Sequence, residues 1–340
     1  MTDCIPTTNV NAPPNGKSAL IIGVSGQDGA LLARLLLAKG YHVHGSSRDA
    51  QIGNFGNLER VGVRHRVQLH SAVTTDFRSV AQLLSRTAPD EVYLLAGQSS
   101  VGLSFEQPVE TLESIALGTL NLLEAIRFLG LPTRLYNAGS SECFGDQEEP
   151  ADEQTAFRPR SPYAVAKASA HWAVASYREA YGLHACTGIL FNHESPLRPL
   201  RFVTRKIVAS VCRIAAGSAE RLRLGNLDIE RDWGWAPEYV DAMWRMLQLP
   251  EANDFVIATG QAHSLRSFVE FAFAALDLDW RAHVDYDDDL RRPSDLRRSV
   301  GCPRRAAEYL GWKATSDLQS VIRRMLDAEQ GRAWPMQANS

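Results

Sequence analysis

Four side chains close together in the sequence are of types that carry out proton transfer. Ser140 and Glu142 stand at the end of an apolar run, and Tyr163 precedes Lys167 by four residues. A Ser-Pro pair just before the tyrosine is typical of a helix start, so Tyr163 and Lys167 are expected on one helix face. A nearby ammonium and the positive end of a helix favour the phenolate over the phenol, whose usual pKa is about 10. The arrangement predicts a tyrosine that acts as a base near neutral pH.

A glycine pattern lies nearer the start of the chain. In IIGVSGQDGALL, Gly23, Gly26 and Gly29 separate an apolar run typical of a buried strand from a helical pattern. Glycines at such a junction allow a tight turn and let a pyrophosphate approach the N-terminus of the helix. The spacing predicts a dinucleotide-binding turn, although a glycine-rich turn without a ligand has a similar sequence.

The end of the second predicted strand bears on the choice of dinucleotide. It ends in two serines followed by Arg48. A carboxylate at this place binds a ribose 2′-hydroxyl, whereas an arginine beside small hydroxyl residues suits a 2′-phosphate. Arg48 therefore favours NADP. Asp49, directly after it, leaves NAD possible.

Strand and helix patterns alternate along the chain. The β-rich runs cover residues 18–24, 41–47, 65–72, 90–97, 133–141, 184–192 and 253–260. Helical patterns lie between them, including a long one at 106–128 and another at 162–181. Such alternation predicts an α/β fold with a Rossmann-like, doubly wound parallel sheet covered by helices on both faces.

After residue 190 the sequence becomes more polar and richer in Arg and Pro. Helical patterns at 203–217, 236–248 and 264–277 interrupt these stretches. We expect a smaller, partly interleaved C-terminal substrate domain over the carboxyl edge of the sheet, where open α/β sheets bind ligands. The expected division is a disordered tail at 1–17, a dinucleotide-binding domain at 18–190 plus about 236–260, and a substrate domain at 191–235 and 261–330.

Composition excludes several classes of function. The 340 residues are 45% hydrophobic and carry a formal charge of −3, which gives no basic field for nucleic acid or an anionic membrane. No apolar run reaches the roughly 20 residues that cross a bilayer, and the first residues lack the features of a signal peptide. Five scattered cysteines without metal-ligand spacing predict reduced thiols, a cytoplasmic location and no metal site.

Several stretches together resemble the nucleotide-sugar branch of the extended short-chain dehydrogenase/reductases, and within it the GDP-mannose 4,6-dehydratase family. They are GVSGQDGALLARLLL, LAGQSSVGLSFEQP, SSECFG, RSPYAVAK, GILFNHESPLRPLRFVTRKI, LGNLDIERDWGWAPEYVDAMW and VIATGQAHSLRSFVE. The similarity runs from about residue 18 to residue 313. It implies oxidation of GDP-mannose at C4, loss of water across C5–C6, and return of the same hydride to C6.

The resemblance implies a role for each of the four side chains. Tyr163 would take the proton of the C4 hydroxyl, and Lys167 would lower its pKa and hold the cofactor ribose. Ser140 would hydrogen-bond the C4 oxygen. Glu142, expected on the same side of an extended segment, would remove the C5 proton and protonate the departing C6 hydroxyl. A simple reductase needs no such acid, so Glu142 favours a dehydratase.

The resemblance also implies the residues that bind ligands. Cofactor contacts would come from Gly23, Gly26, Gln27, Asp28, Gly29, Arg48, Leu95, Ala96, Gln98, Ser99, Lys167, His193 and Arg198. The nucleotide sugar would be held by Asn192, Glu194, Lys206, Asn226, Arg231 and Arg292. The guanidinium forks of Arg231 and Arg292 match phosphate oxygens, but both residues are equally suited to ion pairs between domains.

Some positions depart from the pattern of the family. Val73 stands where an acidic residue usually faces the adenine, and Ser100 stands where the family has histidine. The loop after Arg48 also lacks the usual Arg/Ser-rich character. In the family that loop reaches the cofactor of a neighbouring subunit, so both NADP preference and tetramer assembly stay open.

The helices expected at 106–128 and 162–181 carry apolar residues on more than one face, which predicts a homodimer or homotetramer. In the second helix the residues suited to packing between subunits are Val165, Ala166, Ala168, Ala170, Trp172 and Ala173.

Three other functions remain. One is the same dehydration of a related GDP-sugar such as GDP-manno-heptose. Another, a 4-keto nucleotide-sugar reductase or epimerase, is disfavoured by Glu142. The last, a cofactor-binding regulatory protein, would typically lack Tyr163 or Lys167.

Overall fold

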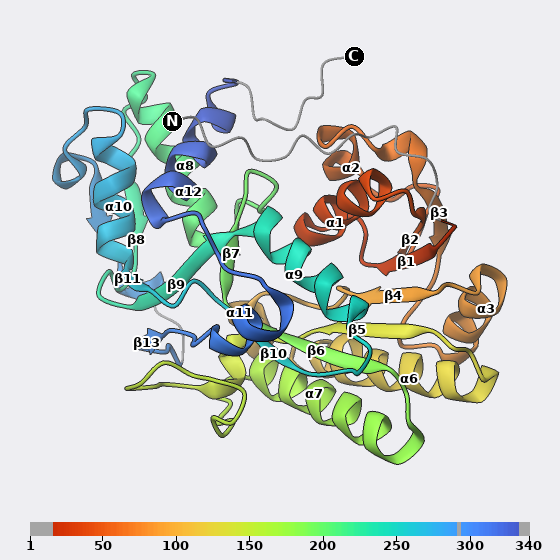
Figure 1. Ribbon diagram of the computed structural model, residues 1–340. Helices are drawn as coiled ribbons and strands as arrows, with labels where there is room; N and C mark the ends of the chain where they lie inside the picture. Colours follow the sequence, from red (N-terminus) through yellow and green to blue (C-terminus); the bar gives the residue numbers. More distant parts are fainter. Residues whose placement is uncertain (1–15, 291–293, 333–340) are drawn as a thin grey trace.

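A seven-stranded, all-parallel sheet forms the centre of the larger part of the molecule (Figure 1). The structure is a computed structural model and describes residues 16–290 and 294–332, so Arg292 and most of the predicted N-terminal tail lie outside the described residues. The sheet order is β3-β2-β1-β4-β5-β6-β10. Its strands are β1 (Ser18–Ile22), β2 (His42–Ser47), β3 (Gln68–Ser71), β4 (Glu91–Leu94), β5 (Arg134–Ala138), β6 (Ala185–Leu190) and β10 (Phe255–Ile257).

Helices cover both faces of this sheet. One face carries α1 (Gln27–Ala38), α2 (Gly56–Arg60) and α9 (Ala236–Gln248), and the other α3 (Phe77–Thr87), α6 (Gly118–Leu129) and α7 (Pro162–Tyr181) (Figure 1). Successive residues of β1 point to opposite faces, so Ile21 packs in the core cluster beneath α1 and Leu20 in the cluster beneath α3 and α6. The prediction of a Rossmann-like doubly wound sheet is confirmed.

The long helix predicted at 106–128 is interrupted. The chain forms α4 (Val101–Glu106), α5 (Pro108–Leu112), a π-helical turn (Glu113–Leu117) and then α6. Pro108 has no backbone N–H to donate, which explains the first break. The predicted start of α7 is as expected: the Ser161 hydroxyl accepts a hydrogen bond from Ala164 N at 3.1 Å, and Pro162 is the first helical residue.

A smaller unit is built on two further sheets. One contains β7 (Asn192–Glu194), β9 (Glu230–Trp235), β11 (Ala262–Ser264) and β13 (Arg298–Ser299); the other pairs β8 (Leu222–Leu224) with β12 (Val284–Tyr286). Its helices are α8 (Val203–Ala215), α10 (Leu265–Ala274) and α12 (Leu318–Glu329), while α11 (Arg304–Leu310) contacts α9 and β10. Short 3₁₀ turns lie at Arg64–Arg66, Ser141–Phe144, Trp280–Ala282 and Asp288–Leu290. The chain returns to the large sheet between these elements, through α9 and β10.

The amino end of the large sheet holds a fully buried carboxylate. Glu91, at the start of β4, accepts hydrogen bonds from the hydroxyls of Tyr41 at 3.0 Å and Tyr93 at 2.7 Å. It also accepts from Gln248 Nε2 of α9 at 3.2 Å, and Lys17 Nζ forms an ion pair with it at 3.2 Å. One side chain thus joins the start of the described chain, the turn before β2, the centre of the sheet and α9.

We expect Glu91→Ala to lower the free energy of unfolding by about 3 kcal/mol, because it leaves the two buried hydroxyls of Tyr41 and Tyr93 without their acceptor. Urea unfolding followed by circular dichroism measures this. Glu308→Ala, at an exposed position of α11, is the control and should leave the unfolding midpoint unchanged. Equal midpoints for the two variants would contradict the structural role of Glu91.

Candidate active site

The glycine turn after β1 lies against the loop after β4, at the point where the order of the strands reverses. Gly23 has φ 94°, and a Cβ atom at this position would lie 2.8 Å from the backbone nitrogen of Ala96. A Cβ on Gly29 would come within 2.4 Å of Gly23 O. Only glycine permits both approaches. The turn therefore meets Leu95 and Ala96 at the topological switch point, where doubly wound sheets bind their ligands.

The N-terminus of α1 is open to an anion. Gly26 is its N-cap, is exposed, and provides no side chain to accept hydrogen bonds from the first N–H groups of the helix. Unsatisfied N–H groups and the helix dipole together favour a phosphate at such an end. The residues present therefore fit the pyrophosphate of a dinucleotide.

A buried hydrogen-bond network fastens this turn to β7. Gln27 Nε2 donates to the backbone oxygen of His193 at 3.1 Å, and the hydroxyl of Ser195 donates to Gln27 Oε1 at 2.7 Å. His193 Nε2 lies 3.0 Å from Asp28 Oδ2, and its Nδ1 lies 2.7 Å from Phe191 O. Gln27 and His193 are thus engaged by protein groups, and they hold the turn in place.

Charge and burial shift the pKa values of Asp28 and His193 in opposite directions. Burial alone would raise the pKa of Asp28, but the charge of His193 and the hydrogen bond to it lower that pKa overall. Burial alone would lower the pKa of His193, but the charge of Asp28 and their hydrogen bond raise it overall. Each partner therefore stabilises the ionised form of the other. The imidazole ring also stacks on Tyr239, with 4.6 Å between ring centroids.

The end of β5 and the start of α7 bring the four proton-transfer residues together. Lys167 Nζ donates to the backbone oxygen of Ala138 at 2.7 Å and lies 5.9 Å from the centroid of the Tyr163 ring. Ser140 forms a side-chain hydrogen bond with Tyr163, and the charge of Glu142 acts on the same phenol. Two sequence-distant elements thus form one cluster at the carboxyl edge of the sheet.

The local geometry of Glu142 differs from the prediction. Ser140 is extended, but the chain turns into the 3₁₀ helix Ser141–Phe144 directly after it, so Glu142 is not part of an extended segment. The Ser140 hydroxyl caps this helix by accepting a hydrogen bond from Glu142 N at 3.3 Å. A serine followed by polar residues favours such a capped turn over continued strand.

Burial dominates the protonation of the cluster. It raises the pKa of Tyr163, and the hydrogen bond with Ser140 offsets this only in part, so the phenol is not acidified as the sequence predicted. Burial lowers the pKa of Lys167 to about 8. The neighbouring Cys143 is 1% exposed, and burial raises the pKa of its thiol to about 12, which excludes it as a nucleophile at neutral pH.

The charged residues of the smaller unit are tied to each other. Arg231 is 4% exposed and donates to Asp295 Oδ1 at 3.0 Å and to Leu296 O at 2.8 Å. Buried Glu194 accepts from the Thr204 hydroxyl at 2.6 Å and forms an ion pair with Arg198 at 3.3 Å. Arg231 thus makes the ion pair that the sequence left open as an alternative to phosphate binding.

The other residues proposed for the nucleotide sugar lie around this group. Lys206 Nζ donates to the backbone oxygen of Arg223 at 2.7 Å, and burial lowers its pKa. Asn226 Oδ1 accepts from the backbone of Asp228 at 2.9 Å, and Asn192 pairs with β9. The side chain of Lys206 is thus bonded to β8, and that of Asn226 to the loop that follows it.

On the cofactor side, Arg48 is exposed after β2. Gln98 Nε2 donates to Ser100 O at 2.8 Å, and the Ser99 hydroxyl accepts from Arg201 at 3.3 Å. Ser100, where the resemblance led us to expect histidine, caps α4 by accepting from Leu103 N at 3.3 Å.

Comparison with known proteins shows the family of the chain. The GDP-mannose 4,6 dehydratase family matches residues 20–325. GDP-mannose 4,6 dehydratase 2 of Arabidopsis thaliana is 44% identical, over 92% of this chain and 87% of its own. GDP-mannose 4,6-dehydratase of Sinorhizobium fredii is 45% identical, over 91% and 95%. The chain belongs to the GDP-mannose 4,6-dehydratase family.

Two solved structures similar to this GDP-mannose 4,6-dehydratase family member carry nicotinamide cofactors. RMD from Pseudomonas aeruginosa, complexed with NADPH, has a TM-score of 0.77 and 25% identity, and the match covers 93% of this chain and all of that one. UDP-glucose 4-epimerase from Thermus thermophilus, in complex with NAD, has a TM-score of 0.81 and 26% identity, with the same coverage.

Two features are absent from residues 16–290 and 294–332 of this dehydratase-family chain. No helix there is long and apolar enough to span a membrane. No group of three or more His, Cys, Asp or Glu side chains there is placed to hold a metal ion.

Sequence reasoning missed two residues of this dehydratase-family site. Ser195 completes the network under the glycine turn, and Arg201 reaches across to the loop after β4. Both lie in the stretch NHESPLRPLRF that carries the family resemblance. Membership of that stretch is the only feature of the sequence that points to them. Their partners are about a hundred residues or more away in sequence, so spacing alone did not reveal them.

The Asp28–His193 pair predicts a pH dependence of stability. The lowered pKa of Asp28 gives a contribution that is present above its ordinary value of 3.8 and is lost on acidification. The raised pKa of His193 gives a contribution that is full below 6.5 and is lost as the pH rises through the raised value. Asp28→Asn should therefore cost most between about pH 4 and pH 6.5, on the order of 2 kcal/mol.

Urea midpoints of both proteins across this pH range measure the effect. Asp49→Asn is the matched control, because that carboxylate is exposed and bonds only within its own turn. A difference between wild type and Asp28→Asn that does not change with pH would contradict the charged pair.

Proposed function

We propose that the protein is a hydro-lyase that converts GDP-D-mannose to GDP-4-dehydro-6-deoxy-D-mannose and water, with transfer of a hydride from C4 to C6. The single observation that carries this is a carboxylate, Glu142, within the Ser140–Tyr163–Lys167 cluster. Oxidation at C4 and reduction at C6 need only Ser140, Tyr163 and Lys167. The elimination also needs a group that takes a proton from carbon, and the family match covers all four positions.

We propose NADP as the cofactor, with NAD as the less favoured choice. When bound, its nicotinamide would supply the acceptor for the C4 hydride and the donor of that hydride to C6. Arg48 is exposed at the tip of β2, where it would bind a 2′-phosphate. Asp49 Oδ1 accepts from the backbone nitrogens of Gln51 at 2.8 Å and Ile52 at 3.1 Å, so this oxygen is already used. The NADPH complex of RMD adds support.

The chain would hold this cofactor along the switch-point crevice. Exposed Gly26 would make room for the pyrophosphate, Gly29 lets the helix pack closely against the turn, and Gln27, Asp28 and His193 fix the turn. The other residues proposed to touch it are Gly23, Arg48, Leu95, Ala96, Gln98, Ser99, Lys167 and Arg198.

The members of the cluster have different tasks in the proposed reaction. Tyr163 takes the proton of the C4 hydroxyl, and Ser140 hydrogen-bonds the C4 oxygen. Lys167, whose pKa burial lowers to about 8, would hold the cofactor ribose, and its ammonium would favour the phenolate of Tyr163 against the effect of burial. Glu142 removes the C5 proton, which the C4 ketone has made acidic, and delivers a proton to the departing C6 hydroxyl.

The smaller unit would bind the nucleotide part of the substrate. Asn192, Glu194, Lys206, Asn226, Arg231 and Arg292 are the proposed contacts. We propose that a diphosphate competes with Asp295 for the guanidinium of Arg231, since a doubly charged group offers more acceptor oxygens. The proposed division places this unit at 191–235 and 261–330, and the cofactor domain at 18–190 plus about 236–260.

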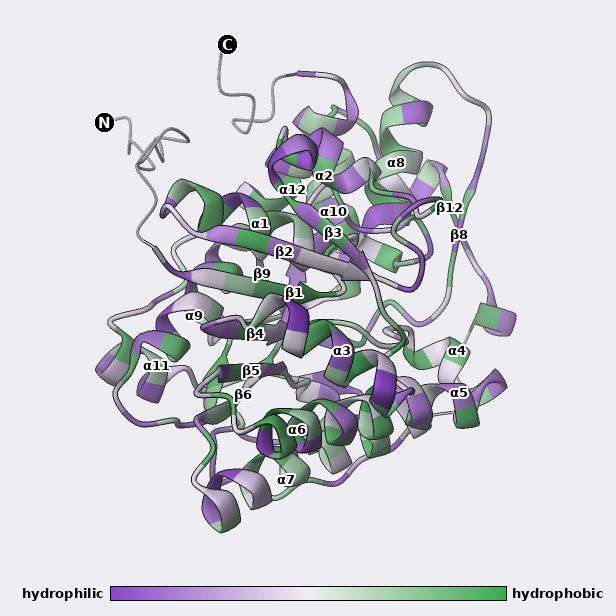
Figure 2. Cartoon of the chain, turned by 90° about the vertical axis from the view of Figure 1, so that its right-hand side faces the viewer, coloured by the Kyte–Doolittle hydropathy of each residue, from purple (hydrophilic) through white to green (hydrophobic). Residues whose placement is uncertain are grey.

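We propose a homodimer formed through α5, α6 and α7. Val109, Leu120 and Trp172 on these helices are 67%, 41% and 62% exposed, and Figure 2 shows hydrophobic residues along α6 and α7. Ala166 and Ala170 are fully buried within their own chain, so they cannot pack between subunits as the sequence suggested. A monomer mass in solution at every concentration would contradict the dimer, and a four-chain mass would favour the tetramer.

We also propose a cytoplasmic location. Cys143, Cys186, Cys212 and Cys302 are free thiols, which is typical of a reducing compartment.

Mass spectrometry of GDP-mannose incubated with the purified protein tests the main proposal. We expect loss of one water without a net change in nicotinamide absorbance, first with no cofactor added and then with NADP⁺. An intact substrate under both conditions would contradict the assignment. Dehydration of GDP-manno-heptose but not GDP-mannose would assign the related sugar instead. Net oxidation of NADPH by a keto-sugar would indicate a reductase.

Glu142→Gln should slow product formation by roughly 10²–10⁴-fold, because the amide cannot accept the C5 proton. GDP-mannose binding should persist, and reduced nicotinamide should accumulate because the hydride is removed from C4 but not returned. Absorbance in a single turnover measures this. Glu149→Gln, an exposed residue a few positions along, is the control. Wild-type turnover by Glu142→Gln would contradict the role of Glu142.

A further inference from the structure

The loop of residues 145–158, which we call the Glu142 loop, begins and ends at the 3₁₀ helix that carries Glu142. Gly145 has φ 74°, and a Cβ atom there would lie 2.4 Å from Arg158 O. Arg158 N donates to Cys143 O at 2.8 Å. The base of the loop is therefore pinned to the helix, and a displacement of the loop is transmitted to the backbone next to Glu142.

The far side of the Glu142 loop is attached to the segment that enters and follows β13. Ala151 N donates to Val300 O at 2.9 Å, and Cys302 N donates to Ala151 O at 2.8 Å. The backbone nitrogen of Arg297 donates to Asp146 Oδ1 at 2.5 Å. The Glu142 loop is thus bonded both to the smaller unit, next to β13, and to the 3₁₀ helix that follows β5 of the large sheet.

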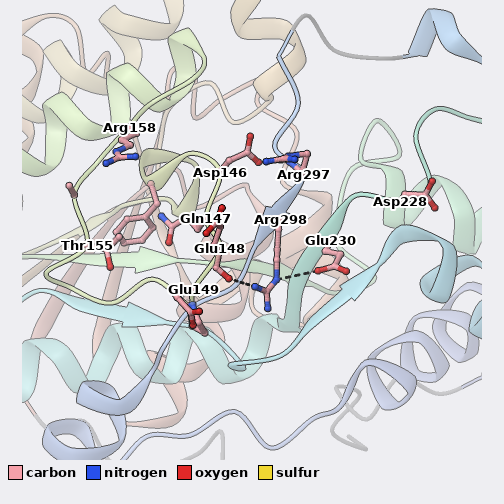
Figure 3. A pocket seen from close by; sticks show the side chains of 13 residues that line it. Asp146, Gln147, Glu148, Glu149, Thr155, Arg158, Asp228, Glu230, Arg297 and Arg298 are labelled. Carbon is pink, nitrogen blue, oxygen red and sulfur yellow. Dashed lines mark hydrogen bonds and ion pairs between the residues drawn. The ribbon is translucent and has the colours of Figure 1, made fainter.

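Between these attachments, the Glu142 loop and β9 are separated by a hollow of about 770 Å³ (Figure 3). Phe144, Glu148 and Glu230 are among the residues that line it. Across a hollow, packing of side chains does not fix the distance between the two walls. Polar contacts that span it must do so.

Arg298 spans this hollow. Its Nε lies 3.2 Å from Glu230 Oε2 of β9, and its Nη1 donates to the backbone oxygen of Glu148 in the Glu142 loop (Figure 3). A planar guanidinium with two contacts in different directions sets both distance and orientation. Arg298 thus adds a side-chain link between two walls that backbone hydrogen bonds of Arg297 and Val300 join at their ends.

The strand held by Arg298 also carries Arg231. Arg298 pairs in register with Glu230, and Ser299 with Arg231, in the parallel pairing of β13 with β9. Arg231 in turn bonds Asp295, which lies just before β13. The proposed diphosphate contact and the bridge of Arg298 are thus on adjacent residues of one strand.

We propose that Arg298 is a positioning residue that sets the place of Glu142 relative to the nucleotide sugar held on β9. The inference rests on the proposed function, because it takes Glu142 as the C5 base. A base must lie within hydrogen-bond reach of its proton, and a displacement of about 1 Å can cost up to about a hundredfold in rate. Tyr163 and Lys167 lie on α7, outside the Glu142 loop, so oxidation at C4 does not depend on the bridge.

Arg298→Ala and Arg297→Ala form a matched pair for the test. Each removes one positive charge at adjacent positions. Arg297 is exposed and contributes its backbone N–H to Asp146, a contact that the substitution keeps. For Arg298→Ala we expect kcat for the 4-keto product to fall on the order of tenfold, with KM for GDP-mannose within about twofold of wild type. Reduced nicotinamide should accumulate in the first turnover. Arg297→Ala should match wild type.

A second readout uses the protein without substrate. Hydrogen exchange of the amides in residues 145–158 should be faster in Arg298→Ala and unchanged in Arg297→Ala. If wild type fails to dehydrate GDP-mannose, the proposed function is wrong, while the exchange experiment still tests the bridge.

Three outcomes would overturn the inference. Equal kcat in the two variants would show that Arg298 has no positioning role. A rise in KM with kcat unchanged would place Arg298 in substrate binding. Slow C4 oxidation in Arg298→Ala would show a general effect on the stability of the site. If Arg298→Ala does not fold, Glu230→Gln replaces it. That variant removes only the charged partner on β9, and it should show the same loss of kcat, whereas wild-type kcat would overturn the proposal.

Discussion

The hydrogen bond from Lys167 Nζ to the backbone oxygen of Ala138 is the constraint on which the site depends. A buried ammonium is costly unless it has acceptors, and the last carbonyl of β5 provides one at 2.7 Å. This contact fixes the rotation of α7 against the sheet. The rotation in turn places Tyr163 beside the end of β5, where the chain turns to present Ser140 and Glu142. One electrostatic requirement thus joins the catalytic helix to the catalytic strand end.

The same edge of the sheet is connected to the smaller unit at two places. Asp28 and His193 connect the glycine turn to β7, and the Glu142 loop connects the end of β5 to β13. Each connection joins the large sheet to the smaller unit through hydrogen bonds, and at the second of them Phe144, Ala151 and Phe191 also belong to one buried apolar cluster. These contacts lie beside the carboxyl ends of the strands, where doubly wound sheets bind their ligands.

Sequence reasoning succeeded where structure is local. The cap at Ser161, the glycine turn and the alternation of strands and helices each follow from neighbouring residues, and together they predict the sheet and the start of α7. It failed where distant residues compete. Burial of Tyr163 outweighs its neighbours, and Arg231 bonds Asp295, which is 64 positions away. The turn after Ser140 was misjudged because a strand pattern extends past the point where a hydroxyl can cap a helix.

The passage of the chain back into the large sheet has a consequence for how the protein is made. β10 is the last strand of that sheet, and α9 packs on α1. Residues 236–257 therefore complete the sheet whose first strand begins at residue 18. A nascent chain that has emerged only to residue 190 exposes the edge of β6 and the apolar side of α1. The large sheet is therefore complete only after β9 of the smaller unit, which precedes α9 and β10 in the chain, has left the ribosome.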